Sequence, residues 1–186
     1  MSFQFKKLQI PDVLYVQTDV FKDERGFFAE MYRYSQFKEM GIDKHFLQVN
    51  HSKSAKNVLR GLHFQLNPKA QAKFVSVIEG EVFDVALDIR VDSPTYGKWV
   101  AEILSADKKN MLYIPEGFAH GFCTLSQTAQ FVYYCTEEYS PEHERGIMWN
   151  DPIVNIQWPV KNPIISGKDK IYLGLDQTEN NFKYDQ

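Results

Sequence analysis

The sequence predicts an all-β protein, a barrel or jelly roll with about eight or more short strands. Short apolar segments rich in Val, Ile, Phe and Tyr recur along the chain, and turn signals separate them. Only one short helix is indicated. No repeat of fixed period, low-complexity tract or Pro/Gly/Ser linker divides the 186 residues, so we expect one domain over residues 1–186.

The expected strands occupy most of the first three quarters of the chain. In the segment 82–89, apolar residues at odd positions share one face, while Asp84 and Asp88 occupy the other. Glu79-Gly80 predicts a hairpin between two of the strands. The expected strands are Val13–Val16, Phe27–Tyr32, Val58–Gln65, Phe74–Ile78, Val82–Ile89, Trp99–Leu104, Leu112–Ile114 and Phe131–Cys135.

Three segments need another interpretation. Ser35 to Met40 predicts a short helix, with Ser35 as N-cap and Gly41 at its end. The segment 117–136 has no charged side chain but several polar ones, so it predicts buried strands around a turn rather than a membrane span. From Pro141 on, Trp and Pro residues predict loops packed over a barrel mouth or a neighbouring subunit.

Composition excludes several classes of protein. Lys plus Arg total 21 and Asp plus Glu total 24, which gives a net charge of −3. A general nucleic-acid binder carries an excess of positive charge, which this chain does not have. Two cysteines, Cys123 and Cys135, make no disulfide framework and predict reduced thiols. The first residues contain no signal peptide, so we expect a cytoplasmic protein that does not associate with membranes.

His63 differs from the other histidines because it lies inside an apolar strand pattern. Strict alternation would separate it from Arg60, unless Gly61 marks a bulge that re-aims one of them. Such a histidine is either a structural group or a general base that a carboxylate orients. Carboxylates available for that role are Asp84, Asp88, Asp151 and Asp169.

Other candidate groups also have two readings. Tyr133 and Tyr134 are adjacent in a strand, so one faces the interior, as a proton donor or as a core tyrosine. Four cations at segment edges or turns are surface charges or, as a set, could bind a diphosphate and polarise a carbonyl. The sequence contains neither a phosphate loop nor the Gly-rich fingerprint of a dinucleotide-binding protein. The cations are Arg25, Arg60, Lys73 and Lys168.

The turn and histidine in the segment 114–122 resemble the second motif of cupins, which are small barrels that often bind metals. The first cupin motif would supply an H-x-H pair, but here the strand reads His63-Phe64-Gln65. A transition-metal site needs about three convergent ligands. The loss of one histidine therefore favours a barrel without a metal.

Several stretches together resemble one family, the dTDP-4-dehydrorhamnose 3,5-epimerases, in colinear order from about Ile10 to Asp169. The resemblance implies a double-stranded β-helix (cupin or jelly-roll) barrel with short peripheral helices, without metal or cofactor. It also implies a homodimer acting on a dTDP-linked 4-keto-6-deoxyhexose. The matching stretches are Phe21–Phe28, Asn57–Gln65, Gly80–Arg90, Ser93–Gly97, Ile114–Phe122 and Trp149–Pro152.

The same resemblance implies roles for individual residues. His63 matches the base and Asp169 the carboxylate that orients it, while Tyr133 matches the acid on the opposite sugar face. Lys73 matches the cation near the 4-keto oxygen, and Tyr139 the residue that stacks on thymine. The implied substrate-binding residues are Arg25, Glu30, Gln48, Asn50, Arg60, Asp84, His120, Tyr139, Glu144 and Lys168.

Two other functions remain open at this point. A single-centre epimerase acting at C3 or C5 of a related nucleotide deoxysugar would keep the same His–Tyr pair. A non-catalytic cupin that binds a nucleotide sugar would need no base, opposed acid and oxyanion partner together. Proton exchange into a keto sugar separates the enzyme from the binding module, because binding alone does not cause exchange.

Overall fold

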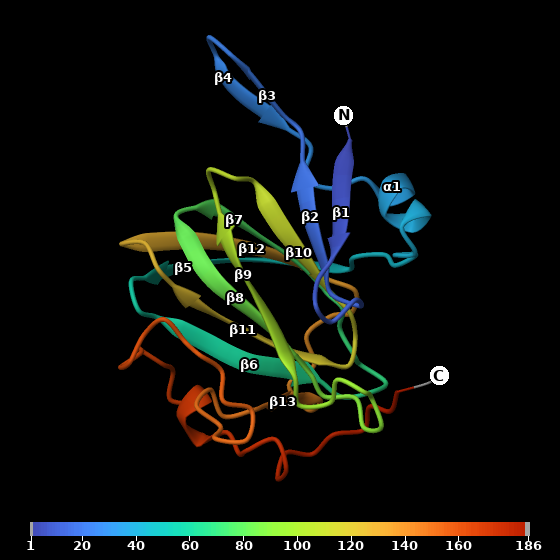
Figure 1. The fold of residues 1–186 in the computed structure, drawn as a ribbon, viewed down its shortest axis with the longest axis vertical. Coiled ribbons are helices and arrows are strands. Elements are labelled where there is room, and N and C mark those ends of the chain that lie inside the picture. Colours follow the sequence, from blue (N-terminus) through green and yellow to red (C-terminus); the bar gives the residue numbers. More distant parts are fainter. Residues whose placement is uncertain (1, 185–186) are drawn as a thin grey trace.

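The computed structural model describes residues 2–184 as two antiparallel sheets stacked face to face, with a separate two-stranded hairpin (Figure 1). This all-β jelly roll is the fold class that the sequence predicts. The six-stranded sheet has the order β1 (Phe3–Lys7), β2 (Leu14–Thr18), β10 (Asn110–Ile114), β7 (Lys73–Glu79), β12 (Thr128–Cys135), β5 (Gln48–Ala55). The five-stranded sheet has the order β13 (Glu144–Gly146), β6 (Leu59–Gln65), β11 (Phe118–Thr124), β8 (Glu81–Asp88), β9 (Trp99–Ser105).

The predicted hairpin at Glu79-Gly80 is wrong. β7 and β8 lie in different sheets, so this turn carries the chain from one sheet to the other. Gly80 has φ +77°, and a Cβ there would lie 2.1 Å from the carbonyl oxygen of Thr128. The glycine is needed for a close approach at a corner of the sandwich, and a sequence signal for a tight turn does not reveal which strands pair.

The inner faces of the two sheets enclose the central core. Val75, Leu112 and Phe131 of the six-stranded sheet pack against Ala86 and Phe122 of the five-stranded sheet. The predicted alternation in β8 is confirmed, but its polar face is buried too, because Asp84 and Asp88 are both 0% exposed. Burial of two carboxylates requires partners. His120 contacts Asp84, and Arg90, Ser93 and Thr95 contact Asp88.

A short α-helix packs on the outer face of the six-stranded sheet. α1 (Tyr34–Glu39) buries Phe37 against Phe74 of β7. The predicted N-cap Ser35 is wrong: Arg33 is the capping residue, and Ser35 lies inside the first turn. The helix ends at Glu39, one residue before the predicted Met40. Gly41 follows the C-cap Met40 with φ +88°, a conformation that glycine adopts without steric cost.

Two strands form a hairpin that extends away from both sheets (Figure 1). β3 (Val20–Asp23) pairs with β4 (Gly26–Ala29), so the strand predicted over 27–32 ends at Ala29. Phe21, Phe27 and Phe28 are each about half exposed or more, at 49%, 59% and 59%. The chain therefore presents aromatic side chains that its own core does not cover.

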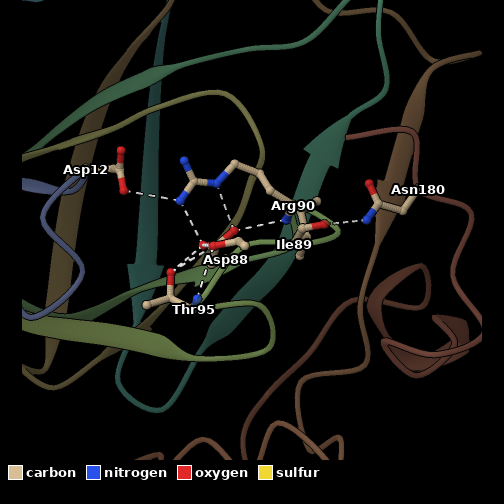
Figure 2. A network of polar contacts seen from close by, with 7 residues as sticks. Asp12, Asp88, Ile89, Arg90, Thr95 and Asn180 are labelled. Carbon is tan, nitrogen blue, oxygen red and sulfur yellow. Dashed lines mark hydrogen bonds and ion pairs between the residues drawn. The ribbon is translucent and has the colours of Figure 1, made fainter. Parts of the chain in front are cut away.

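The C-terminal segment packs on the outer face of the five-stranded sheet, below β6 and β13 in Figure 1, rather than over a barrel mouth. Its short 3-10 helix η1 (Asp169–Ile171) contacts β6. Figure 2 shows how the end of this segment is held: Asn180 donates to the carbonyl of Ile89, next to an Arg90–Asp88 ion pair. No helix in residues 2–184 has the length and apolar character to cross a bilayer.

Candidate active site

A cavity opens between the two sheets and has an inner and an outer part. The inner part is about 210 Å³ and the outer part about 250 Å³. Both parts share a wall of five residues that bear titratable groups, so they form one continuous site. The shared residues are His63, Lys73, Tyr133, Glu144 and Lys168.

A carboxylate holds His63 in one orientation. Nε2 of His63 lies 2.8 Å from Oδ1 of Asp169, which η1 brings to the cavity from a position 106 residues away in the chain. Burial alone would raise the pKa of Asp169, but hydrogen bonds from His63 and from the Gly61 N–H outweigh it and lower this pKa. An ionised Asp169 accepts from Nε2–H and leaves Nδ1 as the unprotonated ring nitrogen.

A bulge in β6 places Arg60 and His63 on the same wall. His63 pairs with His120 of β11 and Arg60 pairs with Phe122, so β6 holds one residue more than β11 between these two positions. Gly61, with φ +126°, is inside the bulge, and its N–H donates to Asp169. The sequence alternative in which Gly61 re-aims one of the two side chains is confirmed.

Tyr133 approaches the cavity from the opposite sheet. It lies on β12 between β7 and β5, whereas His63 lies on β6. Tyr134 points the other way, into the aromatic cluster beside Phe74. Burial raises the pKa of Tyr133, so its hydroxyl stays protonated at neutral pH and is able to donate.

Lys73 is the cation at the centre of the site. Its Nζ donates to the carbonyl oxygen of His63 at 3.3 Å, and the residue is only 8% exposed. Burial lowers the pKa of this ammonium, because the charged form loses hydration. None of the carboxylates in residues 2–184 pairs with it directly, so its charge remains available to a ligand oxygen.

His120 and Asp84 form a second buried pair at the inner end. Nε2 of His120 lies 2.9 Å from Oδ2 of Asp84, and the His120 ring stacks on Phe131 with centroids 6.0 Å apart. Burial raises the pKa of Asp84 and lowers the pKa of His120, so both shifts favour the uncharged forms. Asp84 therefore orients His120 and does not orient His63.

Polar side chains line the outer part. Glu144 accepts from Lys168 at 2.6 Å and from the Tyr139 hydroxyl at 2.7 Å. Gln48 donates to Asn50 at 2.9 Å and accepts from the backbone N–H of Tyr139 at 2.7 Å. These five residues, which the sequence proposed as substrate contacts, lie together around one opening.

Two of the proposed substrate contacts do not reach this cavity within one chain. Arg25 is at the turn of the β3–β4 hairpin, its side chain is 85% exposed, and it pairs with Asp23. Glu30 follows the hairpin and pairs with Arg33. Neither residue therefore lines the cavity formed by its own chain.

The remaining carboxylates have structural contacts. Asp88 pairs with Arg90 at 2.8 Å, and Asp151 accepts from the backbone N–H groups of Ile153 and Leu175 at 2.6 and 2.7 Å. Of the four carboxylates considered for His63, only Asp169 contacts it.

Gln65 stands where cupins have their second histidine, and its side-chain amide hydrogen-bonds to backbone groups. Its amide donates to the carbonyl of Glu138 at 3.2 Å and accepts from the N–H of Ser140 at 2.8 Å, so it positions the loop that carries Tyr139. Within residues 2–184, His, Cys, Asp and Glu side chains form no group of three that could hold a metal ion.

Sequence reasoning did not assign to the site six residues that line the cavity: Ser52, Phe64, Gln65, Gln71, Phe122 and Phe131. Phe122 and Phe131 stack at the inner end with centroids 4.2 Å apart, and Gln71 lies at the outer end. Ser52 lines the inner part from β5. β5 was not among the predicted strands, although Gln48, Asn50, Ser52 and Ser54 repeat at every second position, which is the pattern of a strand with a polar inner face.

Comparison with known proteins gives one consistent family. The model of the dTDP-4-dehydrorhamnose 3,5-epimerase family matches residues 7–177. The dTDP-4-dehydrorhamnose 3,5-epimerase of Shigella flexneri is 58% identical over 164 residues, covering 88% of this chain and 91% of the relative.

Solved structures agree in fold. A dTDP-6-deoxy-D-glucose-3,5-epimerase from Legionella pneumophila in complex with dTDP-4-keto-L-rhamnose is 42% identical, has a TM-score of 0.96 and covers 100% of both chains. A 3'-monoepimerase from Streptomyces bikiniensis in complex with dTDP-quinovose is 31% identical, with a TM-score of 0.86, and covers 91% of this chain and 86% of that one.

Proposed function

The chain belongs to the dTDP-4-dehydrorhamnose 3,5-epimerase family, and we propose that His63 and Tyr133 carry out the family's proton transfers in the cavity described above. It is an isomerase that converts dTDP-4-keto-6-deoxy-D-glucose to dTDP-4-keto-L-rhamnose in rhamnose biosynthesis. The assignment of residues depends chiefly on one observation: a carboxylate-oriented histidine and a protonated tyrosine face one cavity from opposite sheets.

The chemistry begins at the 4-keto group, which acidifies the protons on C3 and C5. Nδ1 of His63 removes one of these protons, and Asp169 stabilises the imidazolium that forms. Electrons of the C–H bond move onto the carbonyl oxygen to give an enolate. The Lys73 ammonium stabilises that negative charge, an effect typically worth about 3–4 kcal/mol for a well-placed donor.

Inversion follows from the position of the acid. Tyr133 returns a proton to the same carbon from the other face of the ring, because it projects from the other sheet. The same two groups then act on the second carbon. All electrons stay in the sugar, so the reaction needs no redox cofactor, and we propose that it needs no metal.

Substrate contacts are assigned by position in the cavity. Arg60 and His120 lie at the inner part, where Arg60 already donates to Ser54 and His120 is held by Asp84. Tyr139 is exposed beside Glu144 at the opening, where its ring is available to stack on thymine. The proposed substrate-binding residues that line this cavity are Gln48, Asn50, Arg60, His120, Tyr139, Glu144 and Lys168, whereas Asp84 lies behind His120 and orients it.

Deuterium exchange tests the function. The protein is incubated in D2O with dTDP-4-keto-6-deoxy-D-glucose and EDTA, and the sugar is followed by NMR and mass spectrometry. We expect deuterium at both C3 and C5, and none with His63→Ala. Tyr133→Phe keeps the base and loses the acid, so it should exchange without inverting.

Other outcomes point to the alternative functions. Label at one carbon alone would indicate a single-centre epimerase, the reaction named for the 31% identical relative. Binding of the sugar by folded protein without any label would indicate a binding module. Loss of exchange in EDTA that added metal restores would contradict the metal-free mechanism.

We also propose that the chain acts as a homodimer in the cytoplasm. The β3–β4 hairpin exposes Phe21, Phe27 and Phe28, and Arg25 at its turn pairs with Asp23 of the same hairpin and does not line the cavity of its own chain. Burial of three half-exposed aromatic side chains against a second copy would be favourable. The exchanged hairpin would bring Arg25 and Glu30 to the partner's cavity. Free, buried Cys123 and Cys135 are compatible with a reducing compartment.

A further inference from the structure

One hydroxyl in the cavity lacks a partner. β5 directs four polar side chains inward, at positions 48, 50, 52 and 54. Gln48 and Asn50 hydrogen-bond to each other at 2.9 Å, and Ser54 accepts from Arg60 at 3.0 Å. Ser52, between these two occupied pairs, makes no such contact.

The Oγ atom of Ser52 is buried, and nothing among the described residues accepts from it or donates to it. Across residues 2–184, four buried side-chain atoms have no partner, and of their residues only Ser52 lines the cavity. A buried hydroxyl without a hydrogen bond typically costs about 1–3 kcal/mol, so its presence in a ligand site indicates that the ligand supplies the bond. The other three atoms belong to Gln36, Thr124 and Tyr172.

Besides Lys73 and Tyr133, to which the reaction assigns roles, Ser52 is a hydrogen-bonding group still available at the inner end. Phe122 and Phe131 supply apolar ring faces there, His120 is bound by Asp84, and the Nε–H of Arg60 is directed at Ser54. A sugar ring in the inner part thus meets aromatic surface, the groups proposed for catalysis, and the unpaired hydroxyl of Ser52.

We propose that Ser52 is a specificity-determining residue whose hydroxyl binds the 2-hydroxyl of the hexose. The proposal rests on the epimerase function. A 4-keto-6-deoxyhexose has hydroxyls only at C2 and C3, besides the anomeric oxygen that carries the nucleotide. C3 inverts during the reaction, and its hydroxyl moves to the other side of the ring. C2 keeps its configuration, so its hydroxyl is the one that a fixed side chain can hold through both inversions.

A substrate–variant cycle tests this contact. The value of kcat/KM is measured for wild type and Ser52→Ala with the natural keto sugar and with its 2-deoxy analogue. Wild type should lose about five- to tenfold on the 2-deoxy substrate, and Ser52→Ala about the same on the natural one. Ser52→Ala should have nearly the same kcat/KM on the 2-deoxy sugar as on the natural sugar, because the hydrogen bond that the 2-hydroxyl makes is already absent in the variant.

The matched control is Thr124→Val, which removes an equally buried and unpartnered hydroxyl outside the cavity. It should discriminate between the two substrates as wild type does. If Ser52→Ala is poorly folded by circular dichroism, Ser52→Cys replaces the strong donor with a weak one of similar shape.

The outcomes separate this inference from the function it rests on. If wild type is active and folded Ser52→Ala prefers the natural sugar over the 2-deoxy sugar as strongly as wild type does, the role of Ser52 is overturned. The epimerase assignment is then unaffected. No exchange by wild type on the natural sugar would overturn the function itself. Equal rates of wild type on both sugars would show that the 2-hydroxyl is not recognised and would also overturn the inference.

Discussion

At the residue scale, Asp169 determines what His63 is able to do. Its carboxylate accepts from Nε2 at 2.8 Å and therefore fixes the tautomer of the ring. Asp169→Asn keeps the shape but loses the charge that stabilises the imidazolium, so we expect kcat to fall about 100-fold. Binding of dTDP should stay unchanged, which a titration by calorimetry measures. Turnover within a few-fold of wild type would assign the orienting role to another group.

The same carboxyl contributes to stability in a pH-dependent way. Its hydrogen bonds lower its pKa in the folded protein, so the stabilisation is present above the unfolded pKa, about 3.9 for Asp, and is lost as pH falls through the folded pKa. The difference in unfolding free energy between wild type and Asp169→Asn should therefore shrink below about pH 4. Urea titrations at pH 6, 4 and 3 measure it, and a constant difference would contradict the lowered pKa.

Lys73 sets the alkaline limit of the reaction. Burial lowers its pKa, whereas burial raises the pKa of Tyr133, so Lys73 loses its proton first as pH rises. Deuterium exchange should decline below the ordinary lysine pKa of about 10.4. Tyr133→Phe should keep this alkaline limb, and Lys73→Arg should move it upward. Removal of the limb by Tyr133→Phe would assign it to the tyrosine.

At the element scale, alternation predicted much of the sheet structure but not which strands pair. The faces of the 82–89 segment and the opposite directions of Tyr133 and Tyr134 follow from the period of two, and both are confirmed. β5 was missed because its inner face is polar, and Glu79-Gly80 was misread because a turn residue does not identify its strand partners. His63 and Asp169 are 106 positions apart in the chain. Residue chemistry alone therefore did not decide which of four carboxylates orients His63.

The exposed β3–β4 hairpin leads to a prediction about shared sites. If Arg25 acts in the partner's cavity, Arg25→Ala and His63→Ala damage different halves of each site. A dimer of one variant chain with the other contains one intact site. Co-expression of the two variants should therefore restore about a quarter of wild-type activity, because half of randomly formed dimers are mixed and each has one of two sites.

Each variant expressed alone is the control and should have low activity. Light scattering should give the mass of a dimer for wild type and for both variants. A stable monomer, or a mixture no more active than its components, would contradict the exchanged hairpin.

At the scale of the whole molecule, Arg90 connects three parts of the chain, and Figure 2 shows its contacts with Asp12 and Asp88. Its guanidinium pairs with Asp88 at 2.8 Å and with Asp12 at 3.2 Å, and it stacks on Tyr184 near the C-terminus. Removal of Arg90 would leave Asp88, which is 0% exposed, without its charge partner. Arg90→Ala should lower the unfolding free energy by about 3–5 kcal/mol.

Denaturant unfolding measures this loss, and kcat of the folded fraction should stay close to wild type, because the network is not part of the cavity. The matched control is Arg145→Ala, whose partner Glu179 has a side chain that is 65% exposed. That change should cost about 1 kcal/mol or less. Equal losses in the two variants would indicate that the buried carboxylate does not depend on Arg90.

The placement of His63 and Tyr133 on opposite walls has a consequence for proton traffic. Each inversion moves one proton onto the histidine and takes one from the tyrosine, so it leaves both groups in the wrong protonation state for the next inversion. A product with two inverted centres therefore requires two resets, in which the imidazolium gives up its proton and the phenolate regains one. The side chain of His63 is 27% exposed, which gives it contact with water, and the raised pKa of Tyr133 makes its phenolate a strong proton acceptor. Solvent at the opening of the cavity thus accepts the proton from His63 and supplies one to Tyr133 between the two inversions.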